Sequence, residues 1–321
     1  YSNVAGAGSV ALGHSAGYNF TGGGGIFVGY EAGHGVASGD VVFVGYQSGK
    51  RASGTGNTAM GYRALYGADS TAANNTGTSN TAIGQYALNW FSKTIASTAV
   101  GAEAGYYSTG SYNTFLGYRA GLGSITSAPY SSGQYNTAIG QSAMQNMTSA
   151  VSNVAVGNSA LQDITSATSN VGVGLNAGAN ITSGGYNTIL GREAGVTMTD
   201  TTSTVLIGYA AGDAINSTDA NGTIAIGYNA GTSITSGQYN TIIGYNAGDA
   251  LVDGDSSTIV GYEAGTALAV TGVRGSTLVG HEAGKALTQG GNNTAIGRSS
   301  LKTQTTGNSN VAIGDQAMQY L

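Results

Sequence analysis

A short apolar pattern recurs along the whole chain. It usually reads as a polar residue, a β-branched residue, two apolar residues and a glycine, as in NTAIG from Asn80 and NTIIG from Asn240. The glycine, here called the repeat glycine, occurs 18 times between Gly13 and Gly314. Its spacing is 16 or 17 residues, apart from two intervals of 23 and two of 19. A period this short is typical of a solenoid in which each repeat forms one coil.

The three residues before each repeat glycine, called the first, middle and last strand positions, predict a β-strand. The first position is β-branched in all 18 repeats, and the last is aliphatic or Met in all 18. β-branched side chains favour pleated strands and are stiff in helices. A helix would also carry a costly glycine in every second turn. We therefore expect an all-β parallel β-solenoid whose coils each hold two short strands and two turns.

Both faces of this strand are apolar. Side chains alternate along a strand, so the first and last positions share one face and the middle position points to the other. We expect the first and last positions to lie inside the coil. Strands that are apolar on both faces are typically buried on both, so the middle position should pack against a second chain or a further layer. Eight repeats carry a large residue at the middle position: Phe27, Phe43, Phe115, Ile189, Leu206, Ile242, Ile259 and Leu278.

The remainder of the coil is also patterned. Ala or Ser stands three residues after the repeat glycine in all 18 repeats, followed by Gly in twelve and by Leu or Met in six. An apolar residue, such as Met147 or Ile234, often lies seven residues after the repeat glycine, and a Ser/Thr/Gly stretch then turns the chain. Asn stands four residues before the repeat glycine in ten repeats. We expect these stacked amides to form a hydrogen-bonded ladder.

No break in composition divides the array, so we interpret residues 1–321 as a single repeat-built domain. The two 23-residue intervals insert loops near 68–79 and 124–134. Loops on a rigid solenoid often carry binding residues. The second loop holds the only proline, Pro129, next to Tyr130, and these two are candidate ligand-binding residues. The alternative is that both loops are neutral surface insertions.

Composition narrows the function classes. Glycine supplies 56 of 321 residues, charged residues only 8%, and the net charge is -5. Ten Lys and Arg residues give no basic surface for nucleic acid. The absence of Cys excludes a disulfide framework, and no apolar run approaches the roughly 18 residues of a membrane span. Because the chain begins at Tyr1 and not at Met, we expect it to be a fragment or a processed product.

Acidic residues offer little sign of catalysis. All five Glu lie two residues after a repeat glycine, a slot shared with Arg63 and Arg119, which predicts a solvated row and not a catalytic pair. Asp249, Asp253 and Asp255 could ligate calcium at a coil edge, but three acids near a turn more often only solvate it. We assign no enzyme activity, no cofactor and no metal.

Tyrosine directly follows the repeat glycine in eight repeats, which predicts an aromatic row near one turn. An exposed Tyr offers an apolar ring and a polar hydroxyl to a partner. Tyr30, Tyr46, Tyr62 and Tyr118 are therefore candidate ligand-binding residues. The alternative is that the rings only stack on one another and staple adjacent coils.

The repeat resembles a known family. The NVAIG element at Asn310 and its variant at Asn153 resemble the NSVAIG repeat of trimeric autotransporter adhesin heads, the YadA-like left-handed β-roll. They are also similar to repeats of phage tail-fibre proteins. The resemblance spans essentially the whole chain and implies a left-handed β-roll of about 18 coils that forms a homotrimer. The large middle-position residues given above would then line the trimer interface.

These observations predict an extracellular fibrous attachment protein on a cell or virion surface. It would present binding loops to a glycan or protein of a host or cell surface. The alternative is a self-assembling structural filament or matrix protein, joined end to end, without a dedicated receptor. Ice binding would suit a solenoid with exposed Thr, but the Thr column shares the face that we expect to lie inside the coil.

Overall fold

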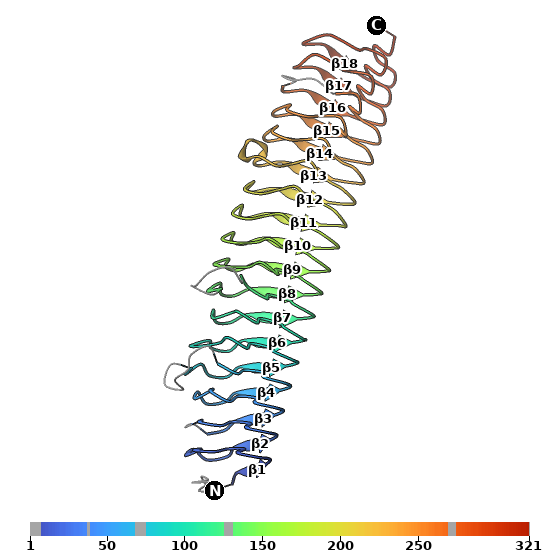
Figure 1. Ribbon diagram of the computed structural model, residues 1–321. Helices are drawn as coiled ribbons and strands as arrows, with labels where there is room; N and C mark the ends of the chain where they lie inside the picture. The colour runs from blue at the N-terminus through green and yellow to red at the C-terminus, as the bar shows by residue number, and fades with distance from the viewer. Residues whose placement is uncertain (1–7, 37–38, 68–74, 125–130, 269–273, 321) are drawn as a thin grey trace. The chain divides into compact units, whose positions relative to one another are not determined.

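The computed structural model describes residues 8–36, 39–67, 75–124, 131–268 and 274–320. The chain divides into two compact units, Tyr1–Ser166 and Ala167–Leu321. In the described part of each unit the regular structure is β, apart from one 3-10 turn, η2 (Thr218–Ala220), in the second unit. Within each unit, successive strands lie one above the next (Figure 1).

Nine short strands form the described sheet of the first unit. They are β1 (Val10–Leu12), β2 (Ile26–Val28), β3 (Val42–Val44), β4 (Thr58–Met60), β5 (Thr81–Ile83), β6 (Thr98–Val100), β7 (Thr114–Leu116), β8 (Thr137–Ile139) and β9 (Val154–Val156). Each strand pairs in parallel with the next along the chain, and equivalent positions of the repeat are partners.

The second unit repeats this arrangement with nine further strands in its described part. They are β10 (Val171–Val173), β11 (Thr188–Leu190), β12 (Val205–Ile207), β13 (Ile224–Ile226), β14 (Thr241–Ile243), β15 (Thr258–Val260), β16 (Thr277–Val279), β17 (Thr294–Ile296) and β18 (Val311–Ile313). Their pairing is also parallel and in register. The expected all-β parallel β-solenoid, with one coil for each repeat, is confirmed.

The second strand expected in each coil is replaced by turns. Among the described residues, only isolated bridges accompany the strands before the repeat glycines. The second and fourth residues after the repeat glycine have positive φ, for example 52° at Glu31 and 62° at Gly33. Left-handed residues at alternate positions keep bending the backbone, so it cannot form an extended strand. Single hydrogen bonds link the coils here, such as Glu31 N–H to the His14 carbonyl at 2.8 Å.

The two faces of the strand are opposite to those expected. The middle position is buried inside its own chain in every strand from β2 to β18, whereas the first and last positions are partly or fully exposed. The side chain of Phe115 is 0% exposed, but that of its neighbour Leu116 is 46% exposed. Both faces are apolar, so hydrophobicity alone did not distinguish inside from outside.

The assignment of the large middle-position residues to a trimer interface is therefore corrected. These side chains form the core of their own coils, with at most 1% exposure, and present no surface to another chain. They are Phe27, Phe43, Phe115, Ile189, Leu206, Ile242, Ile259 and Leu278. The apolar residue seven after the repeat glycine completes this core from the opposite side of the coil, as the buried Met147 and Ile234 illustrate.

The core is packed by complementary sizes within each repeat. All eight repeats with a large middle residue have Gly four residues after the repeat glycine, and all six repeats with Leu or Met there have Ala at the middle position. A Cβ atom added to Gly121 would overlap the ring of Phe115. In the repeat of β8, the small Ala138 is matched by the buried Met144. One large side chain thus fills the space that its partner leaves.

The repeat glycine is required by the approach of neighbouring coils. Gly29 has a φ of 133°, and a Cβ atom on it would overlap the carbonyl group of Gly45. Its own N–H donates to the carbonyl of Leu12 at 2.8 Å. The same close contact recurs at the next repeat glycine, where a Cβ on Gly45 would meet the Gly61 carbonyl oxygen at 2.5 Å. Any side chain at this position would push two coils apart.

The expected asparagine ladder is present. Asn136 is 1% exposed, and its side-chain N–H₂ group donates to the Oδ1 atom of Asn113 at 3.2 Å and to the Ala150 carbonyl at 2.8 Å. Its own Oδ1 accepts from the backbone and side chain of Asn153, at 3.0 and 3.1 Å. These bonds satisfy buried amides that would otherwise cost roughly 1–3 kcal/mol each.

The pairing of a large with a small core residue in each repeat, here called the size rule, predicts that changes at Phe115 and Gly121 partly compensate for each other. Phe115→Ala should lower the free energy of unfolding by about 3–5 kcal/mol because it leaves a cavity. Gly121→Leu should also destabilise the chain because the new side chain overlaps the ring. The double variant recreates the small-large pairing found at Ala138 and Met144, so it should recover about 0.5–3 kcal/mol relative to the sum of the single changes. Urea unfolding followed by circular dichroism would measure this, and strictly additive losses would contradict the rule.

Candidate functional site

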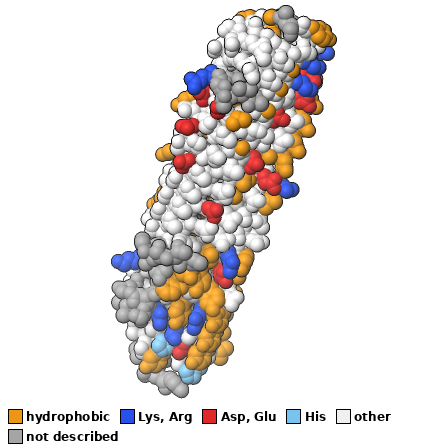
Figure 2. Space-filling model, turned by 45° about the horizontal axis from the view of Figure 1, so that its top comes forward, with side chains coloured by type: hydrophobic (Ala, Val, Ile, Leu, Met, Phe, Trp, Pro, Cys, Tyr) orange, Lys and Arg blue, Asp and Glu red, His pale blue; other side chains and the backbone are white. Residues whose placement is uncertain are grey.

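An apolar surface is formed by the first and last strand positions, here called the outer face. Within the strands of the described residues, Thr is the only polar residue type, and no residue is charged. Large side chains on it are strongly exposed: Met60 and Leu116 are 48% and 46% exposed in the first unit, and Leu190 is 46% exposed in the second. Figure 2 shows hydrophobic side chains, tyrosine included, gathered in bands on the visible surface, with charged side chains in small groups.

The predicted tyrosine row is a stacked ladder in the first unit. His14, Tyr30, Tyr46 and Tyr62 follow one another with ring centroids 5.0–5.2 Å apart and ring planes within 10° of parallel. About 40% of each tyrosine remains exposed. Because each inner ring has a neighbour on both faces, mainly its edge and its hydroxyl reach solvent. The ladder therefore joins successive coils, as the alternative interpretation of the row anticipated.

A second ladder in the second unit has the same geometry. Tyr209, Tyr228, Tyr245 and Tyr262 stack at 5.1–5.3 Å, and His281 continues the stack from Tyr262 at 5.1 Å. Tyr118 in the first unit differs, because the guanidinium of Arg119 lies over its ring at 4.9 Å from the centroid. Three of the four tyrosines selected from the sequence thus belong to a ladder, and the fourth carries a cation on its ring.

The parallel stacking of the first-unit ladder ends at Tyr86. Gln85 follows the repeat glycine here, and the nearest ring is that of Tyr86, one residue later in the turn. Tyr86 meets Tyr62 edge-on, with ring planes at 86°, and Tyr106 is tilted by 57° against both Tyr86 and Tyr107. Partial burial raises the pKa of the Tyr86 hydroxyl, and its hydrogen bond with Tyr62 raises this pKa further.

Three of these rings, those of Tyr86, Tyr106 and Tyr107, line one part of a cleft of about 410 Å³, here called the tyrosine cleft. Its lining residues, which come from four successive coils, are Tyr86, Glu103, Tyr106, Tyr107, Arg119, Leu122 and Gln145. The Nε atom of Arg119 donates to Glu103 Oε2 at 2.7 Å, and this bond raises the pKa of Arg119. The cleft therefore combines an aromatic wall with a neutralised ion pair and an amide.

The sequence interpretation did not identify this cleft. Its candidates followed the most regular column, Tyr directly after the repeat glycine, whereas Tyr86, Tyr106 and Tyr107 all break that column. The useful signal was the irregularity itself: three tyrosines at other turn positions within two neighbouring repeats.

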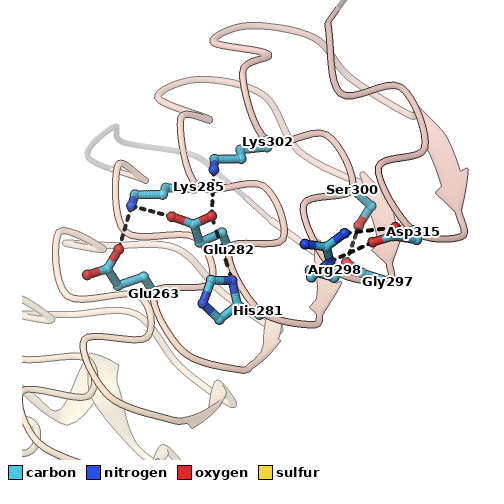
Figure 3. Close-up of polar contacts among 9 residues, drawn as sticks. All are labelled: Glu263, His281, Glu282, Lys285, Gly297, Arg298, Ser300, Lys302 and Asp315. Carbon is cyan, nitrogen blue, oxygen red and sulfur yellow. Dashed lines mark hydrogen bonds and ion pairs between the residues drawn. The ribbon is translucent and has the colours of Figure 1, made fainter.

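A row of alternating charges links three coils of the second unit (Figure 3). Lys285 Nζ contacts Glu263 and donates to Glu282 Oε1 at 2.7 Å, while Lys302 Nζ reaches Glu282 Oε2 at 2.5 Å. The hydrogen bonds from the two lysines lower the pKa of Glu282 to about 2. The hydrogen bonds of Lys285 to the carboxylates of Glu263 and Glu282 raise the pKa of Lys285. Most of these charged side chains are only partly exposed, so their ion pairs help to hold successive coils together.

The acidic residues considered for calcium do not converge. Asp255 accepts from the Gln238 N–H at 3.0 Å and pairs with Arg274 at 3.4 Å, while burial raises the pKa of Asp249. In the part of the chain that the structure describes, no three His, Cys, Asp or Glu side chains are grouped so that they could hold a metal ion. Pro129 and Tyr130, the loop candidates, lie outside the described residues.

One stretch has the G-x-S-x-G spacing of a hydrolase nucleophile, from Gly13 to Gly17. Ser15 there has a φ of 53°, but the equivalent Glu31 and Arg63 both have 52°. No helix follows Ser15, and turns continue to Asn19. The spacing therefore belongs to the ordinary repeat turn and not to the strand–turn–helix elbow of such enzymes.

No protein-family model matches the chain, and no curated protein matches it significantly. Among the described residues, no helix has both the length and the apolar character needed to cross a membrane.

The Glu282 row predicts sensitivity to acid. The pKa of Glu282 falls from an ordinary value of 4.5 to about 2 in the folded chain. A carboxyl group with a lowered pKa stabilises the folded state above its unfolded pKa, and this contribution is lost as pH falls toward the folded pKa. Glu282→Gln should therefore lower the free energy of unfolding at neutral pH, and the difference from the native chain should shrink between pH about 4.5 and 2.

Urea unfolding at a series of pH values would test this. The control is Asp315→Asn, which breaks an exposed ion pair with Arg298 whose side chains are both 59% exposed. Exposed pairs contribute little, so this variant should differ less from the native chain. A deficit of Glu282→Gln that stayed constant with pH would contradict the electrostatic role.

Proposed function

We propose that this chain is an extracellular fibrous attachment protein of the trimeric adhesin or phage tail-fibre type. It acts on a cell or virion surface and presents binding residues to a host or cell-surface glycan or protein. The observation that carries the proposal is the outer face, because an uncharged apolar surface of this regularity calls for a partner. The repeat resemblance supports the same conclusion.

The outer face is costly to leave in water. Fully burying a Val, Leu, Ile or Met side chain stabilises a protein by about 1.5–3 kcal/mol. Side chains such as Met60, Leu116 and Leu190, which are nearly half exposed, would each contribute about 1 kcal/mol on being covered. Large exposed apolar patches on soluble proteins are typical of interaction sites. The face is therefore best explained as an interface.

A second copy of the chain is the occupant that fits best. The side chains of the outer face repeat from coil to coil at the strand spacing, about 4.8 Å. A surface with the same spacing can therefore interlock with them. No residue of the described strands carries a charge, so the outer face offers no ionic recognition to a partner of different chemistry. An identical outer face satisfies both conditions, and the resemblance to adhesin heads favours three copies around one axis.

Light scattering of the native chain should give the mass of a trimer. The double variant Leu116→Asp/Leu190→Asp, with one change in each unit, should be monomeric because covering these positions would bury unpaired charges. Tyr186→Asp is the matched control: Tyr186 is 68% exposed but lies outside the strands, so the trimer should persist. A stable soluble monomer of the native chain would contradict the proposal, and indefinite fibres in electron micrographs would favour the filament alternative.

A second candidate function is ice binding. The sequence predicts that the Thr column lies inside the coil, which argues against ice binding, but first-position residues such as Thr98, Thr114 and Thr188 are exposed. Regular rows of hydroxyl and methyl groups can order water. If the outer face is covered in a trimer, we expect no thermal hysteresis in freezing measurements on the native chain. Hysteresis that disappears in a Thr188→Lys variant would favour this second function.

A further inference from the structure

The tyrosine cleft lies where the parallel stacking of the first-unit tyrosine ladder ends. In the ladder from His14 to Tyr62, stacked rings cover one another, and no ring face is left for a ligand except at an end. Past Tyr62 the rings are tilted by 57–86° against one another, and Tyr86, Tyr106 and Tyr107 line an open cleft. The volume of about 410 Å³ lies within the roughly 300–1,000 Å³ of small-molecule pockets.

The polar groups of the cleft are held in place. Arg119 is fixed on one side by its bond to Glu103 and on the other by its contact with the ring of Tyr118. The hydrogen bond between Arg119 and Glu103 joins one nitrogen of the guanidinium to one oxygen of the carboxylate. A guanidinium has five N–H donors and a carboxylate about four acceptor positions, so the pair retains capacity for hydrogen bonds to a ligand. Gln145 adds an amide with both donors and acceptors.

Charge narrows the class of ligand. The guanidinium of Arg119 places a positive charge beside the aromatic rings, and this charge opposes the attraction of those rings for an ammonium ion. Arg119 is the only cation among the lining residues and is already paired, which disfavours phosphate. What remains is a neutral ligand with one apolar face for the tyrosine rings and several hydroxyl groups for the Glu103, Arg119 and Gln145 side chains.

We propose that the tyrosine cleft binds a neutral pyranose sugar, as a monosaccharide or a disaccharide. The C–H face of the ring packs on Tyr106 and its aromatic neighbours, and the hydroxyls exchange hydrogen bonds with the Glu103–Arg119 pair and Gln145. The role of this site in contact with a host surface rests on the proposed attachment function, but the binding itself does not. The cleft would then be a glycan-binding site formed by residues of the repeat turns.

Saturation-transfer NMR of the full chain with the methyl pyranosides of glucose, galactose, mannose and N-acetylglucosamine, and with lactose and maltose, tests the proposal. At least one sugar should give saturable binding. Tyr106→Ala should weaken it about tenfold or more through loss of the ring contact, equivalent to about 1.4 kcal/mol. Glu103→Gln should also weaken it, because the carboxylate loses acceptor strength and its hold on Arg119.

The matched control is Tyr245→Ala, which removes a 45% exposed tyrosine from the stacked ladder of the second unit and should leave sugar binding unchanged. Circular dichroism confirms that each variant is folded, and Gln145→Ala replaces Tyr106→Ala if the latter is not. Absence of saturable binding by every sugar, or binding that survives all the cleft variants, would overturn the proposal. Absent sugar binding in a chain that remains trimeric would refute this site alone, whereas sugar binding by a monomer would refute the assembly alone.

Discussion

The contact between successive repeat glycines is the constraint on which the rest of the structure depends. Each coil approaches the next so closely that a Cβ atom at Gly29 would overlap the carbonyl group of Gly45. This contact brings the strands into parallel register, and the register places each side chain above its equivalent in the neighbouring coil. The asparagine ladder and the tyrosine stacks are consequences, because each requires like positions to meet at one coil's separation. The row from Glu263 to Lys302 also depends on this separation, because each lysine, five residues after a repeat glycine, reaches a glutamate two residues after the repeat glycine of the preceding coil.

The same constraint leaves a thin core. A coil has room for one large side chain between its strand and its turn, so Phe115 is paired with Gly121 and Met144 with Ala138. With so little interior, the chain depends on its repeated surface contacts for cohesion. It also leaves a regular apolar face outside. That face is the physical reason for the assembly that we propose.

A regular row of stacked tyrosines leaves little room for a ligand on the surface. A perfectly stacked tyrosine row covers its own ring faces and presents mainly edges and hydroxyls. The cleft arises only where the row is broken, at Tyr86, Tyr106 and Tyr107, so deviation from the repeat creates the space that a ligand needs. The charged row around Glu282, in contrast, keeps the repeat register and uses its charges on one another.

Much of the fold was determined by the sequence alone, because a period of 16 or 17 residues, β-branched residues and fixed glycines leave few alternatives to a parallel solenoid. The asparagine ladder and the tyrosine row followed from stacking equivalent positions. Which face of the strand lies inside was decided only by tertiary structure, since both faces are apolar and the choice depends on whether Phe115 or Leu116 fits against the turn. The cleft was likewise decided by tertiary structure: its residues lie as far apart as Tyr86 and Gln145, and their meeting depends on ring tilts that packing across four coils sets and no local pattern encodes.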